Sequence, residues 1–346
     1  MTSTFLNHTK LINLIKLSVN KFNLNLKNKI VLTEAASGNF MCTPIIAAFA
    51  GAEVFAYGKD TVYGKYNKIK KELISLSSKL NIDNKIKVVN CLKKIDLSRI
   101  DVLTNTGHLR PINQNIITKL KSGCVIPLIY EPWEHRHDDV DIDLCAEKGI
   151  KVYGTNESDD KLKTMDYIGY TVLYFLLKEK KTPLSAKILL IGSPKFNIKI
   201  KKILSKISYN VVSLDTKDIE NQDFKKYDVI VFTEFLSKEI LLSDTKNSKI
   251  DFDNICKQTL IINICGKVDI KNKEIKIYPP NPTEANTMNY TTDFIDPKAV
   301  VDLHSGALKV AQGMLYANNL KLSKLEYKII LEKNYNALAF KNNKYW

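Results

Sequence analysis

Arginine is scarce in this chain of 346 residues. Of its 52 basic residues, Arg99, Arg110 and Arg136 are the arginines, and the rest are lysines spread along the sequence. They give a formal net charge of +15, yet no motif of a nucleic-acid-binding module accompanies them. We therefore expect a solvated basic surface that attracts small anions, and no nucleic-acid partner.

Paired cysteines and long apolar runs are also absent. The six cysteines show no C-x-x-C and no metal-type spacing, and several sit in apolar runs, as reduced, buried thiols do. The most apolar long stretch, residues 167–177, is too short to span a bilayer, and no signal peptide is evident. The sequence predicts a cytoplasmic protein without a membrane partner.

Strand-like and helix-like segments alternate along most of the chain. After an amphipathic helix over 5–24, the expected strands cover 29–34, 53–57, 85–90, 101–104, 124–130 and 151–153, with helices over 44–50, 63–80, 113–121 and 141–148. Thr43 is expected to cap the helix that Pro44 begins. A long apolar helix over 161–180 precedes strands over 187–191, 210–214, 228–233, 260–265 and 274–278, a helix over 197–207, and a final helix over 306–319.

This alternation predicts an α/β protein of two Rossmann-like or flavodoxin-like domains with parallel sheets, joined by long interdomain helices. We expect a substrate-type domain over 1–160 and a Rossmann-like, NAD-binding-type domain over 161–303. Residues 304–346 would form a helix that returns to the first domain, followed by a lysine-rich tail.

Polar loops in the first half follow the expected strands. Ligands in open α/β sheets bind beyond the carboxyl ends of the strands, so these loops are candidate substrate-binding segments. They contribute Ser37, Gly38, Asn105, His108, Arg110, Glu131, Glu134 and Arg136. Arginine binds carboxylates or phosphates through two parallel hydrogen bonds, and histidine exchanges protons near neutral pH. The structural alternative is that Arg136 simply pairs with Glu131, Glu134 or Asp139.

A metal site is not expected. His135 and His137 are two residues apart and could chelate, but no zinc template is reproduced.

In the second half, the loop after the strand over 187–191 carries Gly192, Ser193 and Lys195. It holds only the first glycine of a G-x-G-x-x-G dinucleotide fingerprint. Asp215 ends the next strand, where an acid would hold a ribose hydroxyl, and Thr233 ends the following one. His304 follows an apolar, strand-like run over 299–303; it faces the cleft between the domains or is a buried structural histidine.

The order of segments resembles that of the D-isomer-specific 2-hydroxyacid dehydrogenases. The stretch 141–156, the runs 228–236 and 260–267, and His304-Ser-Gly-Ala carry the resemblance, which extends from about 100 to 315. It implies that His304 is the acid–base catalyst, with Glu284 as the loosely matched acid. Lys267 stands where the family has its catalytic arginine, and the glycine fingerprint is broken.

Two interpretations follow. The first is an NAD- or NADP-dependent oxidoreductase of the 2-hydroxyacid dehydrogenase type, acting on a small anionic metabolite. The second is a divergent protein that binds a nucleotide or metabolite without hydride chemistry, or that catalyses another reaction through the His108, Arg110 and Glu131 loops. Analogy with two-domain relatives predicts a homodimer. Fold alone does not distinguish the oxidoreductase from the divergent binding protein.

Overall fold

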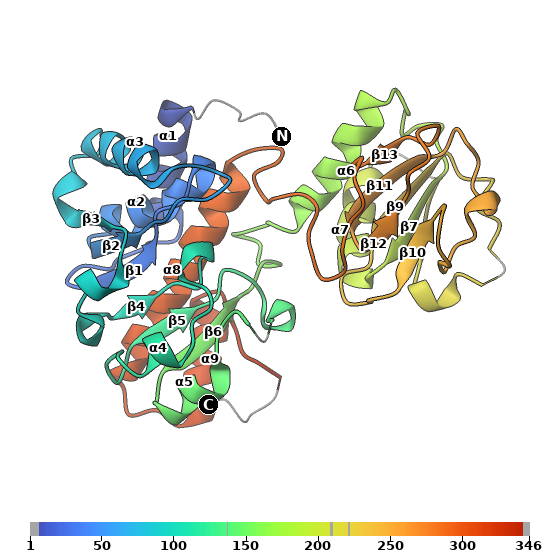
Figure 1. The fold of residues 1–346 in the computed structure, drawn as a ribbon. Helices are drawn as coiled ribbons and strands as arrows, with labels where there is room; N and C mark the ends of the chain where they lie inside the picture. Colours follow the sequence, from blue (N-terminus) through green and yellow to red (C-terminus); the bar gives the residue numbers. More distant parts are fainter. Residues whose placement is uncertain (1–6, 137, 208–209, 221, 342–346) are drawn as a thin grey trace. The chain divides into compact units, whose positions relative to one another are not determined.

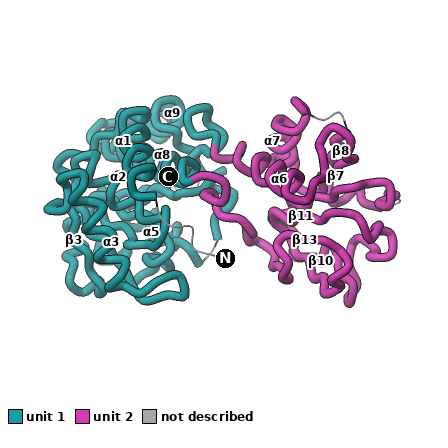
Figure 2. The backbone as a smooth tube through the Cα atoms, turned by 90° about the horizontal axis from the view of Figure 1, so that it is seen from above, with its two compact units in different colours: residues 1–163, 297–346 teal, residues 164–296 magenta. Residues whose placement is uncertain are grey.

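The computed structural model describes residues 7–136, 138–207, 210–220 and 222–341 (Figure 1). The chain forms two compact units, Met1–Lys163 with Pro297–Trp346 as unit 1 and Thr164–Asp296 as unit 2 (Figure 2). Residues 161–163 and 297–303, expected in the second domain, therefore belong to unit 1. The predicted α/β class with parallel sheets is confirmed.

Unit 1 contains a seven-stranded sheet in the order β14-β6-β5-β4-β1-β2-β3. All neighbours are parallel except β14, which is antiparallel to β6. The order of β1 to β6 is the 3-2-1-4-5-6 order of a dinucleotide-binding fold. The strands are β1 (Ile30–Glu34), β2 (Glu53–Tyr57), β3 (Ile86–Val89), β4 (Val102–Leu103), β5 (Val125–Pro127), β6 (Lys151–Thr155) and β14 (Ala337–Leu338).

Helices cover both faces of this sheet because successive strand residues point to opposite sides. Val31 packs in the core beneath one set of helices, and Leu32 packs in the core on the opposite face. The first set comprises α1 (His8–Lys21), α2 (Cys42–Phe49), α3 (Tyr66–Ser78), α8 (Lys298–Asn318) and α9 (Lys324–Asn334). The second comprises α4 (Gln114–Ile117) and α5 (Ile142–Glu147).

Unit 2 contains a five-stranded parallel sheet in the order β13-β11-β9-β7-β8. Its strands are β7 (Ile188–Gly192), β8 (Val211–Leu214), β9 (Val229–Thr233), β11 (Leu260–Cys265) and β13 (Ile277–Tyr278). This is the Rossmann order without its third strand. Where that strand would be expected, the described part of the β8–β9 connection contains the 3-10 helix Thr216–Asp218. The helices α6 (Asp166–Lys178) and α7 (Pro194–Leu204) contact the sheet, while β10 (Ile240–Ser243) and β12 (Lys267–Asp269) contribute to the core over Leu189 and Ile191.

Several predicted elements were wrong in detail. The strand-like run over 299–303 is helical, because α8 begins at Lys298 and buries these residues on the sheet. Thr43 lies inside α2 and does not cap it. The tail expected after residue 319 contains α9 and β14, and β10 and β12 were not predicted. No described helix is long and apolar enough to cross a membrane.

Candidate functional site

Each sheet has one point at which the strand order reverses, and ligands of open α/β sheets bind there, outside the carboxyl ends of the strands. In unit 1 this switch point lies between β1 and β4, and in unit 2 it lies between β7 and β9. Nine of the sixteen residues selected from the sequence lie at the ends of these four strands or in the segments that follow them.

At the switch point of unit 1, Glu34 links the end of β1 to the loop after β4 by hydrogen bonds. Its Oε2 accepts a hydrogen bond from the His108 N–H at 2.9 Å, and the Glu34 N–H donates to Thr106 Oγ1 at 3.2 Å. A Cβ at Gly107 would lie 3.2 Å from Glu34 Oε2 and 4.0 Å from Arg110 Nη2. A larger residue at this position would therefore crowd the Glu34 carboxylate.

Arg110 is held by a buried network. Its Nη1 donates to Asp139 Oδ1 at 3.0 Å, and the Tyr130 hydroxyl donates to the other oxygen of Asp139 at 2.8 Å. Burial raises the pKa of Tyr130, so its hydroxyl stays protonated and remains a donor. The network fixes the guanidinium while leaving the Arg110 side chain 27% exposed.

Two further polar side chains, Asn105 and His108, lie beside this network. Asn105 is fully buried; its Oδ1 accepts the Ile129 N–H at 2.9 Å, and its carboxamide also interacts with the Tyr130 hydroxyl. His108 Nδ1 is likewise buried and has no partner in the described part of the chain. Such groups are costly to bury unless a ligand or water satisfies them.

Ser37 and Gly38 lie in the loop after β1. Gly38 has φ +60°, a left-handed conformation that favours glycine, and no atom lies within 4 Å of the position of an added Cβ. Ser37 precedes the 3-10 turn Gly38–Met41, which leads into α2.

A second polar cluster follows β5 and β6. Glu134 is hydrogen bonded to Glu157, and Trp133 Nε1 donates to Glu131 Oε2 at 2.8 Å. Burial raises the pKa of Glu134 to about 7 and that of Glu157 well above its usual range, while Arg136 favours the charged form of Glu134. The two carboxyl groups therefore share a proton at neutral pH.

His304 is enclosed between helices of unit 1. It lies on α8, and its Nδ1 is hydrogen bonded to the Thr43 hydroxyl of α2. The Phe40 ring packs edge-to-face against the imidazole, with the two ring centroids 5.9 Å apart. The side chain is 1% exposed, and burial lowers its pKa to about 4, so it is neutral at pH 7. A substrate does not reach this imidazole in the observed conformation.

At the switch point of unit 2, β7 ends at Gly192 and β9 ends at Thr233. Gly192 has φ +129°, and a Cβ there would lie 2.5 Å from the backbone N of Glu234. Asn197, at the third glycine position of the fingerprint, donates from Nδ2 to Gly192 O at 3.2 Å and accepts from the Thr233 hydroxyl at 2.7 Å. A carboxamide thus links the β7 and β9 ends where a dinucleotide fingerprint has a small residue.

Ser193 and Lys195 stand at the start of α7. The Ser193 N–H donates to Thr233 O at 3.2 Å, Pro194 has no N–H, and the Asn197 N–H donates to Ser193 O at 3.0 Å. The turn consequently offers few backbone donors, and the Ser193 hydroxyl and the Lys195 ammonium are its main groups for an anion. Asp215 follows β8 and accepts the Lys217 N–H at 3.2 Å.

Of the three residues assigned to catalysis, two lie together. Lys267 Nζ is 3.8 Å from Glu284 Oε2 in unit 2, with 33% and 76% of their side chains exposed, whereas His304 belongs to unit 1. No group of three or more His, Cys, Asp or Glu among the described residues is arranged to hold a metal ion. His137 lies outside the described residues.

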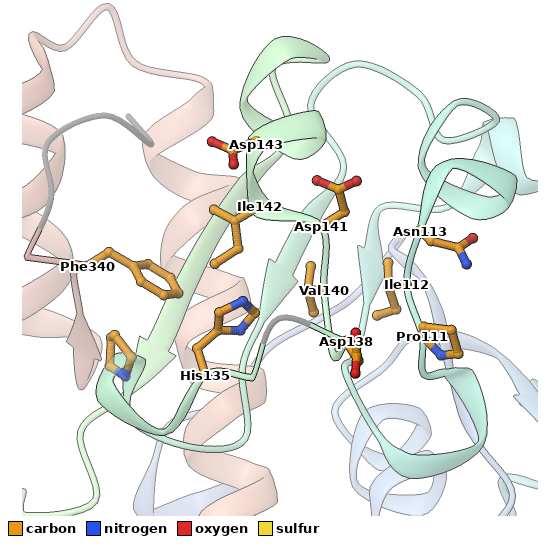
Figure 3. Close-up of a pocket in the computed structure, with 11 residues that line it drawn as sticks. Pro111, Ile112, Asn113, His135, Asp138, Val140, Asp141, Ile142, Asp143 and Phe340 are labelled. Carbon is orange, nitrogen blue, oxygen red and sulfur yellow. The ribbon is translucent and has the colours of Figure 1, made fainter. Parts of the chain in front are cut away.

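A cavity of about 790 Å³ adjoins the Arg110 network in unit 1 (Figure 3). It is formed by the segments after β4 and β5, the start of α5, and Phe340 after β14. Sequence reasoning missed this cavity, together with Glu157 and the pairing of Asp139 with Arg110. The acid-rich loop over 131–139 hinted at Asp139; nothing in the sequence indicated that Glu157 meets Glu134.

No protein-family model matches the chain, and no curated protein matches its sequence. Solved structures match over most of its length. Dipicolinate synthase from Bacillus subtilis is 13% identical, with a TM-score of 0.52 over 86% of this chain and 99% of that one. Dipicolinate synthase from Bacillus halodurans is 9% identical, with a TM-score of 0.50 over 82% and 97%. NAD+-bound 3-phosphoglycerate dehydrogenase from Entamoeba histolytica is 13% identical, with a TM-score of 0.47 over 86% and 97%. At these identities the likeness shows the fold, and this chain shares the α/β fold of the two dipicolinate synthase structures.

Proposed function

We propose that the chain is an NAD- or NADP-dependent oxidoreductase that acts on a small anionic metabolite. The observation that carries the proposal is the β7/β9 switch point of unit 2, where a close-approach glycine, a helix start and Lys195 occur together. The family resemblance of the sequence and the shared fold support it.

The residues of unit 2 fit the adenosine half of such a cofactor. Asp215, at the end of β8, would accept hydrogen bonds from a ribose hydroxyl, and Ser193 and Lys195 would bind the pyrophosphate. Because Pro194 and the bonded N–H groups leave few backbone donors, we expect side chains to bind the phosphates more than in the glycine-rich fingerprint. When bound, the nicotinamide would exchange a hydride with the substrate.

In unit 1 we propose that Arg110 binds the anionic group of the substrate and that His108 exchanges the proton. Asn105, which is fully buried, positions the loop after β5 by accepting the Ile129 N–H. Arg110 has exposed surface, and His108 Nδ1 has no hydrogen-bond partner within the described part of the chain. The acid–base role expected for His304 passes to His108 in this proposal, because His304 is enclosed and neutral. Lys267 remains a second anion-binding group, since its exposed pair with Glu284 is weak.

Binding of NADH and NADPH to the full chain, followed by nucleotide fluorescence, tests the proposal. We expect saturable binding that Lys195→Met weakens about tenfold, the value of one charge-assisted contact. Lys257→Met is the matched control: Lys257 is an exposed lysine of unit 2 paired with Glu274, and its loss should leave affinity unchanged. Absence of binding at millimolar nucleotide would refute the proposal.

One observation favours the second function, ligand binding without hydride chemistry. Asn197 fills the junction between β7 and β9 with a hydrogen-bonded carboxamide. If the protein binds inorganic phosphate through Lys195 but neither dinucleotide, this second function is supported. We also propose the homodimer that the resemblance implies, which sedimentation equilibrium would test.

A further inference from the structure

In unit 2, a side-chain hydrogen bond joins the segments on either side of β7. This strand lies between β8 and β9 in the sheet, and its last residue, Gly192, pairs with Thr233 of β9. Thr216, two residues after β8, donates its hydroxyl at 3.1 Å to Oε2 of Glu234, which directly follows β9. The bond therefore spans the carboxyl end of β7, at the switch point where we propose that the nucleotide binds.

The carboxylate of Glu234 is held in one position. Its Oε1 accepts the N–H groups of Leu236 and Ser237 at 3.0 and 3.1 Å, and its Oε2 accepts the Thr216 hydroxyl. The residue is half-buried, so part of its surface is in contact with solvent. A carboxylate oxygen can accept two hydrogen bonds, and Oε2 accepts one from the described part of the chain. The side chain thus presents a fixed acceptor to a ligand that carries a donor group.

Asp215 lies on the other side of the same hydroxyl. Its Oδ1 is 3.5 Å from Thr216 Oγ1, so carboxylates from the ends of β8 and β9 face one hydroxyl group. A hydroxyl has a single proton, and the shorter contact assigns that proton to Glu234. The adenosine ribose of NAD(H) brings its 2′ and 3′ hydroxyls as further donors. The two acids therefore suit a neutral diol better than an anion.

The positive charge beside these acids is already paired. Lys217 Nζ lies 3.7 Å from Asp215 Oδ2. Among the residues that the structure describes, Glu234 forms no ion pair with a lysine or an arginine. This leaves a local negative charge at the end of β9, in a chain whose net charge is +15. A 2′-phosphate carries nearly two negative charges, and it would meet the Glu234 carboxylate at short range.

We propose that Glu234 is a specificity-determining residue: its carboxylate, together with Asp215, accepts the ribose hydroxyls of NAD(H) and repels the 2′-phosphate of NADP(H). The inference rests on the proposed function and deepens it, because that function leaves the choice between the two nucleotides open. It assigns the choice to the residue after β9 as well as to the acid that follows β8.

Titration of the full chain with NADH and with NADPH, followed by nucleotide fluorescence, tests the assignment. We expect NADH to bind at least about tenfold more tightly than NADPH. Added salt should narrow this ratio, because it screens the repulsion between partly exposed charges. Failure of both nucleotides to bind would overturn the inference together with the proposed function, whereas equal binding of the two by the wild type would overturn the inference alone.

The change Glu234→Gln removes the charge and preserves the hydrogen bonds. The glutamine carbonyl can accept the N–H groups of Leu236 and Ser237, and its amide can donate to Thr216. We expect NADPH to bind about tenfold more tightly to this variant, and NADH about threefold more weakly because a charge-assisted hydrogen bond is lost. Opposite changes for the two nucleotides distinguish a change of specificity from damage to the fold, which would weaken both.

The matched control is Glu239→Gln. Glu239 is an exposed acid of unit 2 that pairs with Lys249, so its loss makes the same change in net charge and should leave both affinities unchanged. No gain in NADPH affinity in Glu234→Gln, or an equal gain in Glu239→Gln, would overturn the assignment to Glu234.

Discussion

The carboxyl pair of Glu134 and Glu157 should make unit 1 less stable as the pH rises. Burial raises the pKa of Glu157 well above its usual range, so the folded protein keeps this proton at pH 7, whereas the unfolded chain loses it near pH 4.5. Above pH 4.5 the folded state therefore binds more protons than the unfolded state, and the free energy of unfolding falls by about 1.4 kcal/mol per pH unit for one such group.

The change Glu157→Gln isolates this effect. Glutamine cannot ionise, and its amide still donates a hydrogen bond to Glu134. Between pH 4.5 and 7, the wild type should therefore lose stability that the variant keeps, with a slope of at most about 1.4 kcal/mol per pH unit from Glu157. The pKa of Glu134, raised to about 7, adds a smaller decline of the same sign in both proteins.

Urea unfolding at several pH values measures the difference. The chain has two tryptophans, so a Trp346→Phe background leaves Trp133, next to the carboxyl pair, as the reporter of unit 1. Glu147→Gln removes an exposed carboxyl group of the same unit and should keep the wild-type pH dependence. Parallel pH profiles for wild type and Glu157→Gln would refute the shared-proton reasoning.

Three further predictions concern the two units. Gly192→Ala should lower the stability of unit 2 by more than about 2 kcal/mol in urea unfolding, because φ is +129° and the added Cβ would lie 2.5 Å from the Glu234 backbone. Thr43→Val removes the hydrogen-bond partner of the buried His304 Nδ1 and should cost about 1–3 kcal/mol in thermal unfolding; a neutral result would mean that water replaces the hydroxyl. Arg110→Lys keeps the charge but loses the planar fork, so substrate KM should rise more than about tenfold while NADH affinity stays constant; an unchanged KM would remove Arg110 from the substrate site.

Local sequence signals located the strands well, because buried parallel strands are short apolar runs bounded by turns. The same signal failed at residues 299–303. Their β-branched, apolar composition is typical of a strand, but α8 buries Val300 and Val301 against the sheet, and this packing overrides the weak local preference. Thr43 failed as a cap for a related reason, since α2 starts at Cys42 and the hydroxyl is used by His304.

The candidate site was predictable only in part. Arg110, His108 and Gly192 stood out because they follow strands, and strand ends are where ligands bind. The contact of Glu134 with Glu157 depends on the pairing of β5 with β6 and on a close approach at Gly154, where a Cβ would lie 2.4 Å from Pro132 Cδ. Such contacts between distant residues leave no pattern in one sequence.

Amide hydrogen exchange of the full chain, with and without NADH, tests the central claim most directly. A ligand that binds the native state slows exchange where it contacts the backbone. The account predicts slower exchange in the β7–α7 turn over 192–197 and at the end of β8 over 215–217. Unchanged exchange in both segments at saturating nucleotide, or protection confined to unit 1, would contradict it.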